Sequence, residues 1–172
     1  MVATVAVMTA VTAVFTILVQ VPIPATKGYF NFSDVAVFFT AFALGPFAGS
    51  IAGGLGTALA DVITGFPQWA PISLLAHGLE GLVAGLIAGL ASRSIQGAPR
   101  GGGRAFAWIA GSFAGAVVMV GLYLAGGLFL TGGAAVLEVP FNIVQAAVGA
   151  ALGSGLAVVV HRAYPPVRDL RW

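Results

Sequence analysis

Long apolar segments alternate with short polar ones along most of the chain. Crossing the hydrocarbon takes about 20 helical residues, and fewer where a segment is short or partly re-entrant. Clusters of proline, glycine and polar residues, such as "VPIPATKGYFNFSD" and "GFPQWAP", interrupt the apolar pattern and break helices. The pattern predicts an all-α integral membrane protein with one transmembrane domain and six spans, over residues 2–20, 34–45, 47–64, 72–91, 105–129 and 140–160.

The composition supports a lipid environment. Of the 172 residues, 59% are hydrophobic and 7% are charged, more apolar surface than a soluble domain of this size can bury. The 25 glycines favour close packing of membrane helices. The chain has no cysteine, which excludes disulfides and thiolate chemistry. The first segment is apolar from Val2 and has no positive flank, which favours a first span over a cleaved signal peptide.

The basic residues predict an orientation. Lysine and arginine gather in the cytoplasmic loops of membrane proteins. Six of the seven basic residues lie in the segment after the fourth span or in the C-terminal tail, and six crossings put those two segments on one side. We therefore expect both termini to be cytoplasmic, with loops 21–33, 65–71 and 130–138 outside. Lys27 alone falls on the outer side.

Polar side chains gather in the outer halves of the predicted spans. Ionisable residues inside spans usually face a cavity or a partner. His77 and Glu80 lie one helical turn apart, and the residues from Glu138 to Gln145 include three polar positions spaced for one helix face. An outward-open pocket explains this one-sided pattern better than a pore does. We expect it to bind a flat heteroaromatic ligand through Asn31, Trp69, His77, Glu80, Tyr123, Asn142 and Gln145, with Tyr29, Asp61 and Glu138 as the lid or supporting wall.

Structural roles compete with this interpretation. Trp69 and Tyr29 are also typical of the aromatic belt at the membrane interface. His77 and Glu80 could form a pair that locks two helices, and Asn142 and Gln145 could be interhelical hydrogen-bonding residues. The common depth of these residues on one side favours the pocket.

The first span carries a stripe of small residues at Ala3, Ala6, Ala10 and Ala13. This stripe suits either internal packing or docking of another membrane protein.

Several catalytic signatures are missing. Lys27 is the only lysine and lies in an outer loop, so there is no Walker A motif. The two histidines lie near opposite faces, so we expect no two-histidine metal site, and we expect neither a metal nor a cofactor. The sequence thus favours a binding protein over two alternatives: a non-catalytic membrane scaffold, and a membrane enzyme that uses His77 and Glu80 as an acid–base pair.

Three segments carry a family resemblance. They are "GYFNFSDVAVFFTAFALGPFAGSIAGGLGTALADVI", "APISLLAHGLEGLVAGLIAG" and "EVPFNIVQAAVGAALG". The chain resembles the substrate-binding S components of energy-coupling factor (ECF) transporters, in the branch with riboflavin-type and hydroxymethylpyrimidine-type members. His77 stands where that branch more often has a lysine.

The resemblance implies a high-affinity subunit of an ABC-type vitamin importer and not an enzyme. It implies six helices, an outward-facing site capped by the loop after the first helix, and a small vitamin or precursor as ligand. The resemblance does not choose among three ligands: riboflavin, a thiamine-precursor pyrimidine and a form of vitamin B6. The implied partners are a membrane T component, contacted through Ala6 and Ala10, and two cytoplasmic ATPases. The resemblance also implies a multi-pass protein in the plasma membrane of a prokaryote. No nucleic-acid partner is expected.

Overall fold

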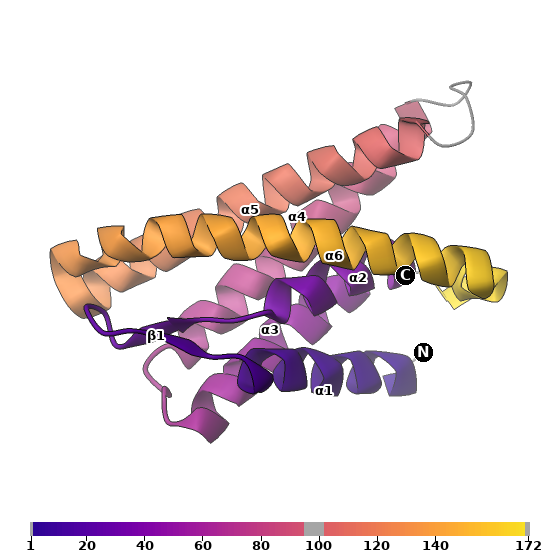
Figure 1. Ribbon diagram of the computed structural model, residues 1–172. Helices are drawn as coiled ribbons and strands as arrows, with labels where there is room; N and C mark the ends of the chain where they lie inside the picture. Colours follow the sequence, from indigo (N-terminus) through magenta and orange to yellow (C-terminus); the bar gives the residue numbers. More distant parts are fainter. Residues whose placement is uncertain (1, 95–101, 171–172) are drawn as a thin grey trace.

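The computed structural model describes residues 2–94 and 102–170, and Figure 1 traces the chain through them. Helices dominate, as expected. The elements, in chain order, are α1 (Val2–Leu18), β1 (Val21–Ile23), β2 (Gly28–Phe30), α2 (Ser33–Leu44), α3 (Pro46–Thr64), α4 (Ala70–Ser94), α5 (Gly102–Thr131), the 3₁₀ helix η1 (Gly132–Glu138), α6 (Val139–Ala163) and the 3₁₀ helix η2 (Pro165–Leu170).

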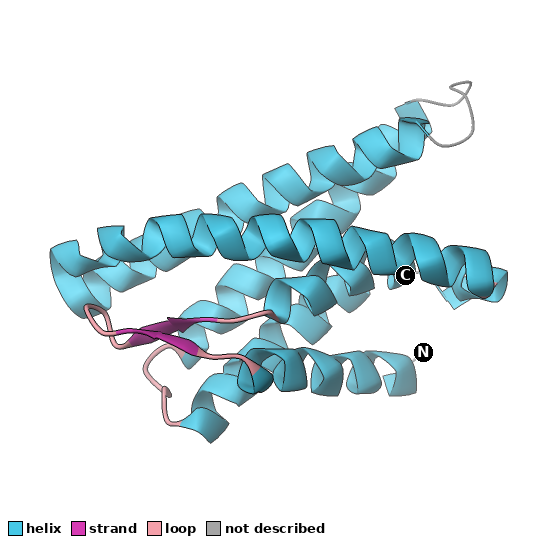
Figure 2. Cartoon of the chain, in the orientation of Figure 1, coloured by secondary structure: helices cyan, strands magenta, loops and turns pink. Residues whose placement is uncertain are grey.

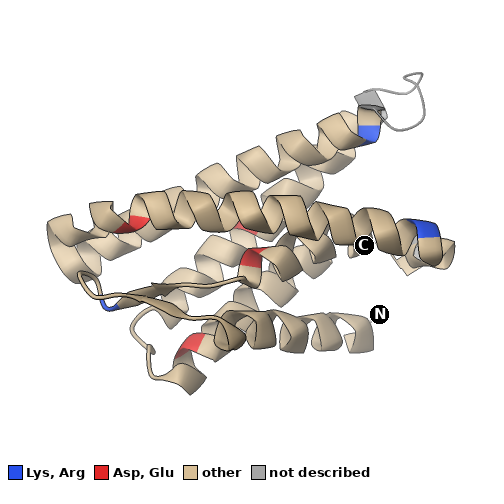
Figure 3. Cartoon of the chain, in the orientation of Figure 1, with Lys and Arg blue, Asp and Glu red and all other residues tan. Residues whose placement is uncertain are grey.

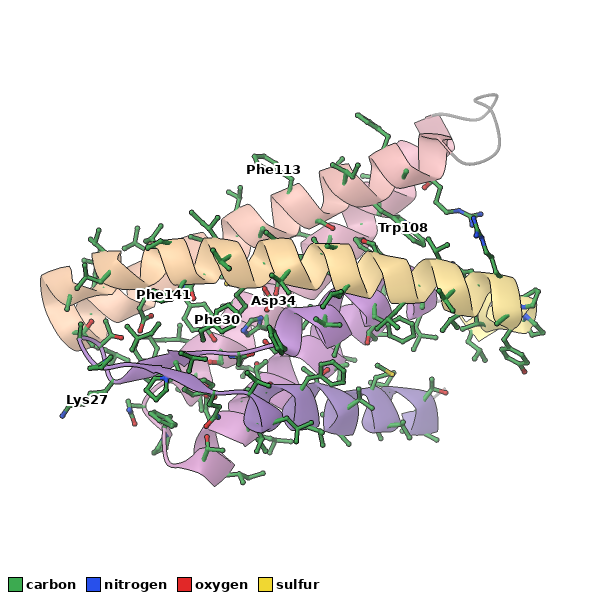
Figure 4. The ribbon with its side chains drawn as sticks, in the orientation of Figure 1. Lys27, Phe30, Asp34, Trp108, Phe113 and Phe141 are labelled. Atoms are coloured by element: carbon green, nitrogen blue, oxygen red, sulfur yellow. The ribbon has the colours of Figure 1, made fainter. Side chains whose placement is uncertain are left out.

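The helices run back and forth between two ends of an elongated bundle (Figure 1). The N-terminus and the C-terminus lie at one end, here called the termini end. The β1–β2 hairpin, the connection from α3 to α4 and η1 lie at the opposite end, here called the pocket end. Figure 3 shows basic residues, in blue, near the termini end and at the hairpin turn, where Figure 4 labels Lys27. The predicted separation of basic residues thus follows the two ends, and the side of the membrane that each end faces stays a prediction.

Within residues 2–94 and 102–170, three stretches are long and apolar enough to cross a membrane. They are Pro46–Thr64, Ala70–Ser92 and the continuous stretch Gly103–Ala163, which contains both α5 and α6. The helices α1 and α2 are apolar but shorter. At about 1.5 Å per residue, α2 is only roughly 18 Å long and cannot cross the hydrocarbon core by itself. Nearly all its residues are buried inside the bundle. The second predicted span is thus a short internal helix, and the six-span count stays a prediction.

The outer loop predicted over residues 21–33 contains a small antiparallel sheet, which the all-α prediction did not include (Figure 2). Val21 pairs with Phe30, Pro22 with Tyr29, and Ile23 with Gly28. Pro22 signals a helix break, but an edge strand also tolerates a proline that donates no hydrogen bond. The turn closes through Lys27, whose φ of 54° is left-handed. The hairpin folds the loop back over the pocket end.

Small residues set the spacing of the central helices. A Cβ added at Gly81 of α4 would lie 2.5 Å from the backbone oxygen of Gly49 in α3. The two backbones therefore touch, and α4 also packs extensively against α5. At the termini end the core is apolar and aromatic: Phe42 stacks on Trp108 with ring centroids 5.2 Å apart. His161 is a buried polar neighbour of Trp108 there, with ring centroids 5.9 Å apart.

We predict that Gly81→Ala lowers the thermal stability of the purified protein, because α3 and α4 must move apart to admit the methyl group, at a cost of about 1–3 kcal/mol. Gly89→Ala is the matched control on the same helix, since a Cβ there meets nothing within 4 Å. That change should be neutral or stabilising through helix propensity. Equal melting temperatures for both variants in detergent would contradict the close α3–α4 contact.

Candidate functional site

A narrow cavity lies at the pocket end beneath the hairpin. Its free volume is about 20 Å³, room for roughly one water molecule. The lining comes from seven elements of the chain and from the Asn31 and Trp69 connections. It comprises Thr16, Gly28, Tyr29, Asn31, Thr57, Asp61, Trp69, Ser73, Tyr123, Glu138, Asn142 and Gln145. Eight of the ten residues expected to form the pocket or its wall are in this lining. The exceptions are His77 and Glu80.

The hairpin is fastened to the rest of the bundle at two points. The Tyr29 hydroxyl donates a hydrogen bond to Asp61 Oδ1 of α3, and the Thr26 hydroxyl donates one to Glu138 Oε1 of η1. Gly28 lies directly against the Glu138 carboxylate, where a side chain would collide with it. Burial, followed by the neighbouring Asp61 charge, raises the pKa of Tyr29, so its phenol stays a donor. The hairpin therefore forms a closed lid.

The cavity wall is partly aromatic. Trp69 is buried and lies beside Tyr123 of α5, with ring centroids 6.2 Å apart. The Tyr123 hydroxyl hydrogen-bonds the Ser73 hydroxyl of α4 at 2.6 Å. Burial in the bundle speaks against a simple belt role for Trp69, because belt residues sit at the lipid interface. Planar walls of this kind suit a flat ring.

Two lining residues hold a buried polar atom that has no hydrogen-bond partner among the described residues. These atoms are Oδ2 of Asp61 and Nδ2 of Asn142. A buried polar group without a partner costs free energy, so such atoms in a cavity are placed to meet a ligand or water. Together they offer an acceptor and a donor on the wall of one small cavity.

The network beneath the cavity contains a residue that the sequence analysis did not select. The Oε1 atom of Gln145 accepts the Asn31 backbone N–H at 2.9 Å, and its Nε2 donates to Asp34 Oδ1 at 3.0 Å. Asp34 lies in the first turn of α2, close to α6, as Figure 4 shows. A carboxylate in the first turn of a helix is common because it interacts favourably with the helix dipole. The position of Asp34 in the sequence therefore does not indicate its contacts with Gln145 and His77. The one sequence signal for Asp34 is that an ionisable residue lies at the edge of an apolar segment, where such residues often face a partner.

His77 and Glu80 lie one layer below the cavity, together with Asp34. His77 Nδ1 is 2.9 Å from Glu80 Oε2 and 3.3 Å from Asp34 Oδ1, and all three side chains are fully buried. The His77 ring packs edge-on against Tyr123, with centroids 5.5 Å apart. His77 thus contacts a residue that lines the cavity, Tyr123, and Glu80 contacts His77. Direct contact of His77 and Glu80 with a ligand stays a prediction.

The alanine stripe on α1 faces outward. Ala3, Ala6 and Ala10 are exposed, whereas Val5, Met8 and Thr12 on the opposite side of the helix are buried. The structure thus leaves Ala6 and Ala10 free to meet a neighbour, and their docking role stays a prediction.

A polar, aromatic-walled cavity at one end of an apolar bundle defines a membrane protein that binds small molecules. A family model described as "ECF-type riboflavin transporter, S component" matches residues 1–162. The chain belongs to this family, which confirms the resemblance read from its sequence. It is therefore a substrate-binding transporter subunit, of a family that works with a T component and ATPases.

Two relatives and one solved structure are also similar to this chain. The chain is 38% identical over 157 residues to an uncharacterized protein of Pyrococcus woesei, covering 91% of this chain and 98% of that protein. It is 29% identical over 158 residues to the thiamine precursor transporter HmpT of Lactococcus lactis subsp. cremoris, covering 91% and 85%. The S component of a bacterial ECF transporter has the same fold, with a TM-score of 0.65, 22% identity, and coverage of 94% and 95%.

We predict that lid closure is pH-dependent through Glu138. Burial beneath the hairpin raises the pKa of Glu138, and the Thr26 hydrogen bond offsets part of this rise. The pKa of Glu138 is therefore higher in the closed state than in the open state. Ionisation of this carboxyl at higher pH then costs more free energy in the closed state and disfavours closure. The closed form should therefore be more populated at about pH 5 than at about pH 8.

The measurement is the distance between spin labels on Ala25→Cys and Val136→Cys, two exposed sites of a chain without native cysteine. The fraction of short distances should rise as the pH falls. Glu138→Gln in the same background should remove this dependence. A pH response that survives Glu138→Gln would assign the effect to another group.

Proposed function

We propose that this S component captures a single-ring vitamin precursor that carries an amine, of the thiamine-precursor pyrimidine class. The observation that carries the proposal is the pair of unpartnered atoms on the cavity wall, Asp61 Oδ2 and Asn142 Nδ2. An aminopyrimidine has an amine donor next to a ring-nitrogen acceptor, which is the complementary pair. The similarity to a thiamine precursor transporter supports the same class.

The recognition geometry follows from the cavity lining. Asp61 accepts from the ligand's amine, and Asn142 donates to a ring nitrogen. Trp69 and Tyr123 cover the apolar faces and edges of the ring. Asn31 and Gln145, already joined by a hydrogen bond, hold the floor of the cavity, so that His77 and Glu80 act on the ligand through Gln145, Asp34 and Tyr123.

The closed cavity is too small for an organic ring, so the lid must open before a ligand enters. Each attachment of the hairpin is a single side-chain hydrogen bond, worth about 1 kcal/mol or slightly more where a carboxylate accepts. Such a lid can open without unfolding the helices. A single pyrimidine ring requires less displacement of the lid than a three-ring flavin does.

Riboflavin is the second candidate, because the family model carries that description. A thermal-shift panel on the purified chain separates the two ligands. The panel contains hydroxymethylpyrimidine, riboflavin and pyridoxine, each at about 100 times its dissociation constant, which adds about 2.7 kcal/mol of apparent stability for a true ligand. A riboflavin response without a pyrimidine response would replace the proposed ligand. If none of the three compounds raises the melting temperature, the result would favour the non-catalytic scaffold.

We predict that Asp61→Asn weakens binding of hydroxymethylpyrimidine by about 10- to 100-fold, because a hydrogen bond to a charged acceptor contributes about 1.5–3 kcal/mol. Calorimetry on the purified protein measures the affinity. Val62→Ala, at the neighbouring exposed position, is the control and should bind like the wild type. Equal affinities for Asp61→Asn and Val62→Ala would remove Asp61 from the ligand site.

We further propose that the exposed α1 stripe docks the T component through Ala6 and Ala10. Close approach of two membrane helices requires small residues at the contact. Replacing both alanines by leucine should reduce co-purification of the T component and the ATPases at least about 10-fold while leaving the ligand-induced thermal shift intact. Ala105→Leu, at an exposed alanine of α5, is the control. Full assembly of the Ala6→Leu, Ala10→Leu variant would move the interface elsewhere.

A further inference from the structure

Three potential metal ligands converge in the centre of the bundle, one layer below the cavity. Asp34 comes from the first turn of α2, and His77 and Glu80 come from successive turns of α4. One donor atom from each residue lies within 4.8 Å of the donor atoms of the other two. All three side chains have an exposed fraction of 0%. The group is therefore built into the core and is not an ordinary surface cluster of acidic residues.

Both carboxylates keep a free donor atom at this place. Asp34 Oδ2 and Glu80 Oε1 are buried and have no hydrogen-bond partner among the described residues. The other oxygen of each carboxylate is the one that faces His77 Nδ1. Unpartnered carboxylate oxygens are rare in the interior of a protein, where each costs the desolvation of a polar group. The pair is an independent sign that the cluster is arranged to bind a ligand.

The charge of the cluster points to a divalent cation. Its two carboxylates bring two negative charges when ionised, and no lysine or arginine with a described side chain pairs with either of them. A neutral cluster requires either two added protons or one divalent ion with a neutral imidazole. Uncompensated charge in an apolar core is very costly, so one of these states must hold. Only the metal also uses the two free carboxylate oxygens as acceptors.

The spacing fits a coordination shell. Zinc binds imidazole nitrogen and carboxylate oxygen at about 2.0–2.2 Å, so neighbouring ligand atoms lie roughly 2.8–3.6 Å apart in octahedral or tetrahedral geometry. Glu80 Oε2 lies 2.9 Å and Asp34 Oδ1 3.3 Å from His77 Nδ1. The free oxygen of each carboxylate can join the same ion when that carboxylate binds through both oxygens. One imidazole with two carboxylates is a donor set for zinc and other first-row transition metals, whereas magnesium and calcium prefer oxygen alone.

Polar neighbours hold Asp34 in place for this role. Its Oδ1 atom accepts hydrogen bonds from Gln145 Nε2 at 3.0 Å and from the Ser33 hydroxyl at 3.2 Å. These donors fix the carboxylate and leave Oδ2 free, as outer partners of metal ligands do. Gly149 of α6 lies directly against Asp34 and lets the two helices approach, because a side chain there would collide with it.

We infer that Asp34, His77 and Glu80 form a binding site for one divalent first-row transition-metal ion, which ties α2 to α4 beneath the ligand cavity. The ion enters with the carboxylates ionised and the imidazole neutral, so that loading releases the protons that otherwise neutralise the cluster. The site is independent of the proposed vitamin ligand. It revises the expectation of no metal, which considered only the two histidines and not the carboxylate on α2.

The test uses the full chain in detergent, treated with chelator and then titrated with Co²⁺ in the absence of any vitamin. We expect about one equivalent to bind, with visible absorption bands of a nitrogen- and oxygen-ligated ion that Zn²⁺ removes. His77→Gln should lower the Co²⁺ affinity at least about 100-fold. The control His161→Gln changes the only other histidine, at the termini end, and should retain the wild-type bands.

The inference is overturned if the wild type binds less than about 0.1 equivalent, or if His77→Gln and wild type give the same bands. Should His77→Gln fail to fold, X-ray absorption of the zinc-loaded wild type tests the inference instead. The zinc coordination shell must then contain one imidazole and at least two oxygen ligands. A zinc shell without imidazole would also overturn it. If Co²⁺ binds but no compound in the vitamin panel shifts the melting temperature, the metal site is retained and only the proposed function is rejected.

Discussion

The hydrogen bond between Gln145 and Asp34 joins the parts of this protein that matter for binding. It connects α6 to α2, and through the Asn31 backbone it connects both helices to the hairpin. Asp34 in turn lies against His77 of α4. A carboxylate, an imidazole and an amide buried in an apolar bundle cannot be left unpartnered without a large cost in free energy. Their mutual pairing therefore fixes how α2, α4 and α6 meet.

Polar and apolar packing are separated along the bundle. Near the termini, the core consists of small and aromatic residues, with Phe38, Phe42 and Trp108 in contact. Near the hairpin, hydroxyls, amides and carboxylates surround a cavity. A membrane offers no water to its hydrocarbon core, so polar groups are tolerated where they face one another or a ligand. This separation favours the pocket end as the place where a ligand binds.

The short helix α2 matters more for the site than its length suggests. It is buried by its neighbours, and its first turn delivers Asp34 to the centre of the protein. The Asn31 side chain accepts the Ser33 backbone N–H at 2.7 Å, just before α2 begins. Asn31 therefore lies between the hairpin and the helix and also lines the cavity. A movement of the hairpin would thus act on the start of α2, from which Asp34 extends.

The sequence alone determined the helical membrane class, the family and most of the cavity lining. Hydrophobic runs show directly as composition, and polar residues inside them are few enough to be selected one by one, as with Asp61, Asn142 and Gln145. Tertiary structure decided which of these residues share a cavity and which lie beneath it. It placed His77 and Glu80 below the cavity, folded the loop after the first helix into a hairpin, and brought Asp34 to a histidine 43 positions away in the sequence. Helical periodicity orders residues along one helix, but only packing between helices determines which faces meet.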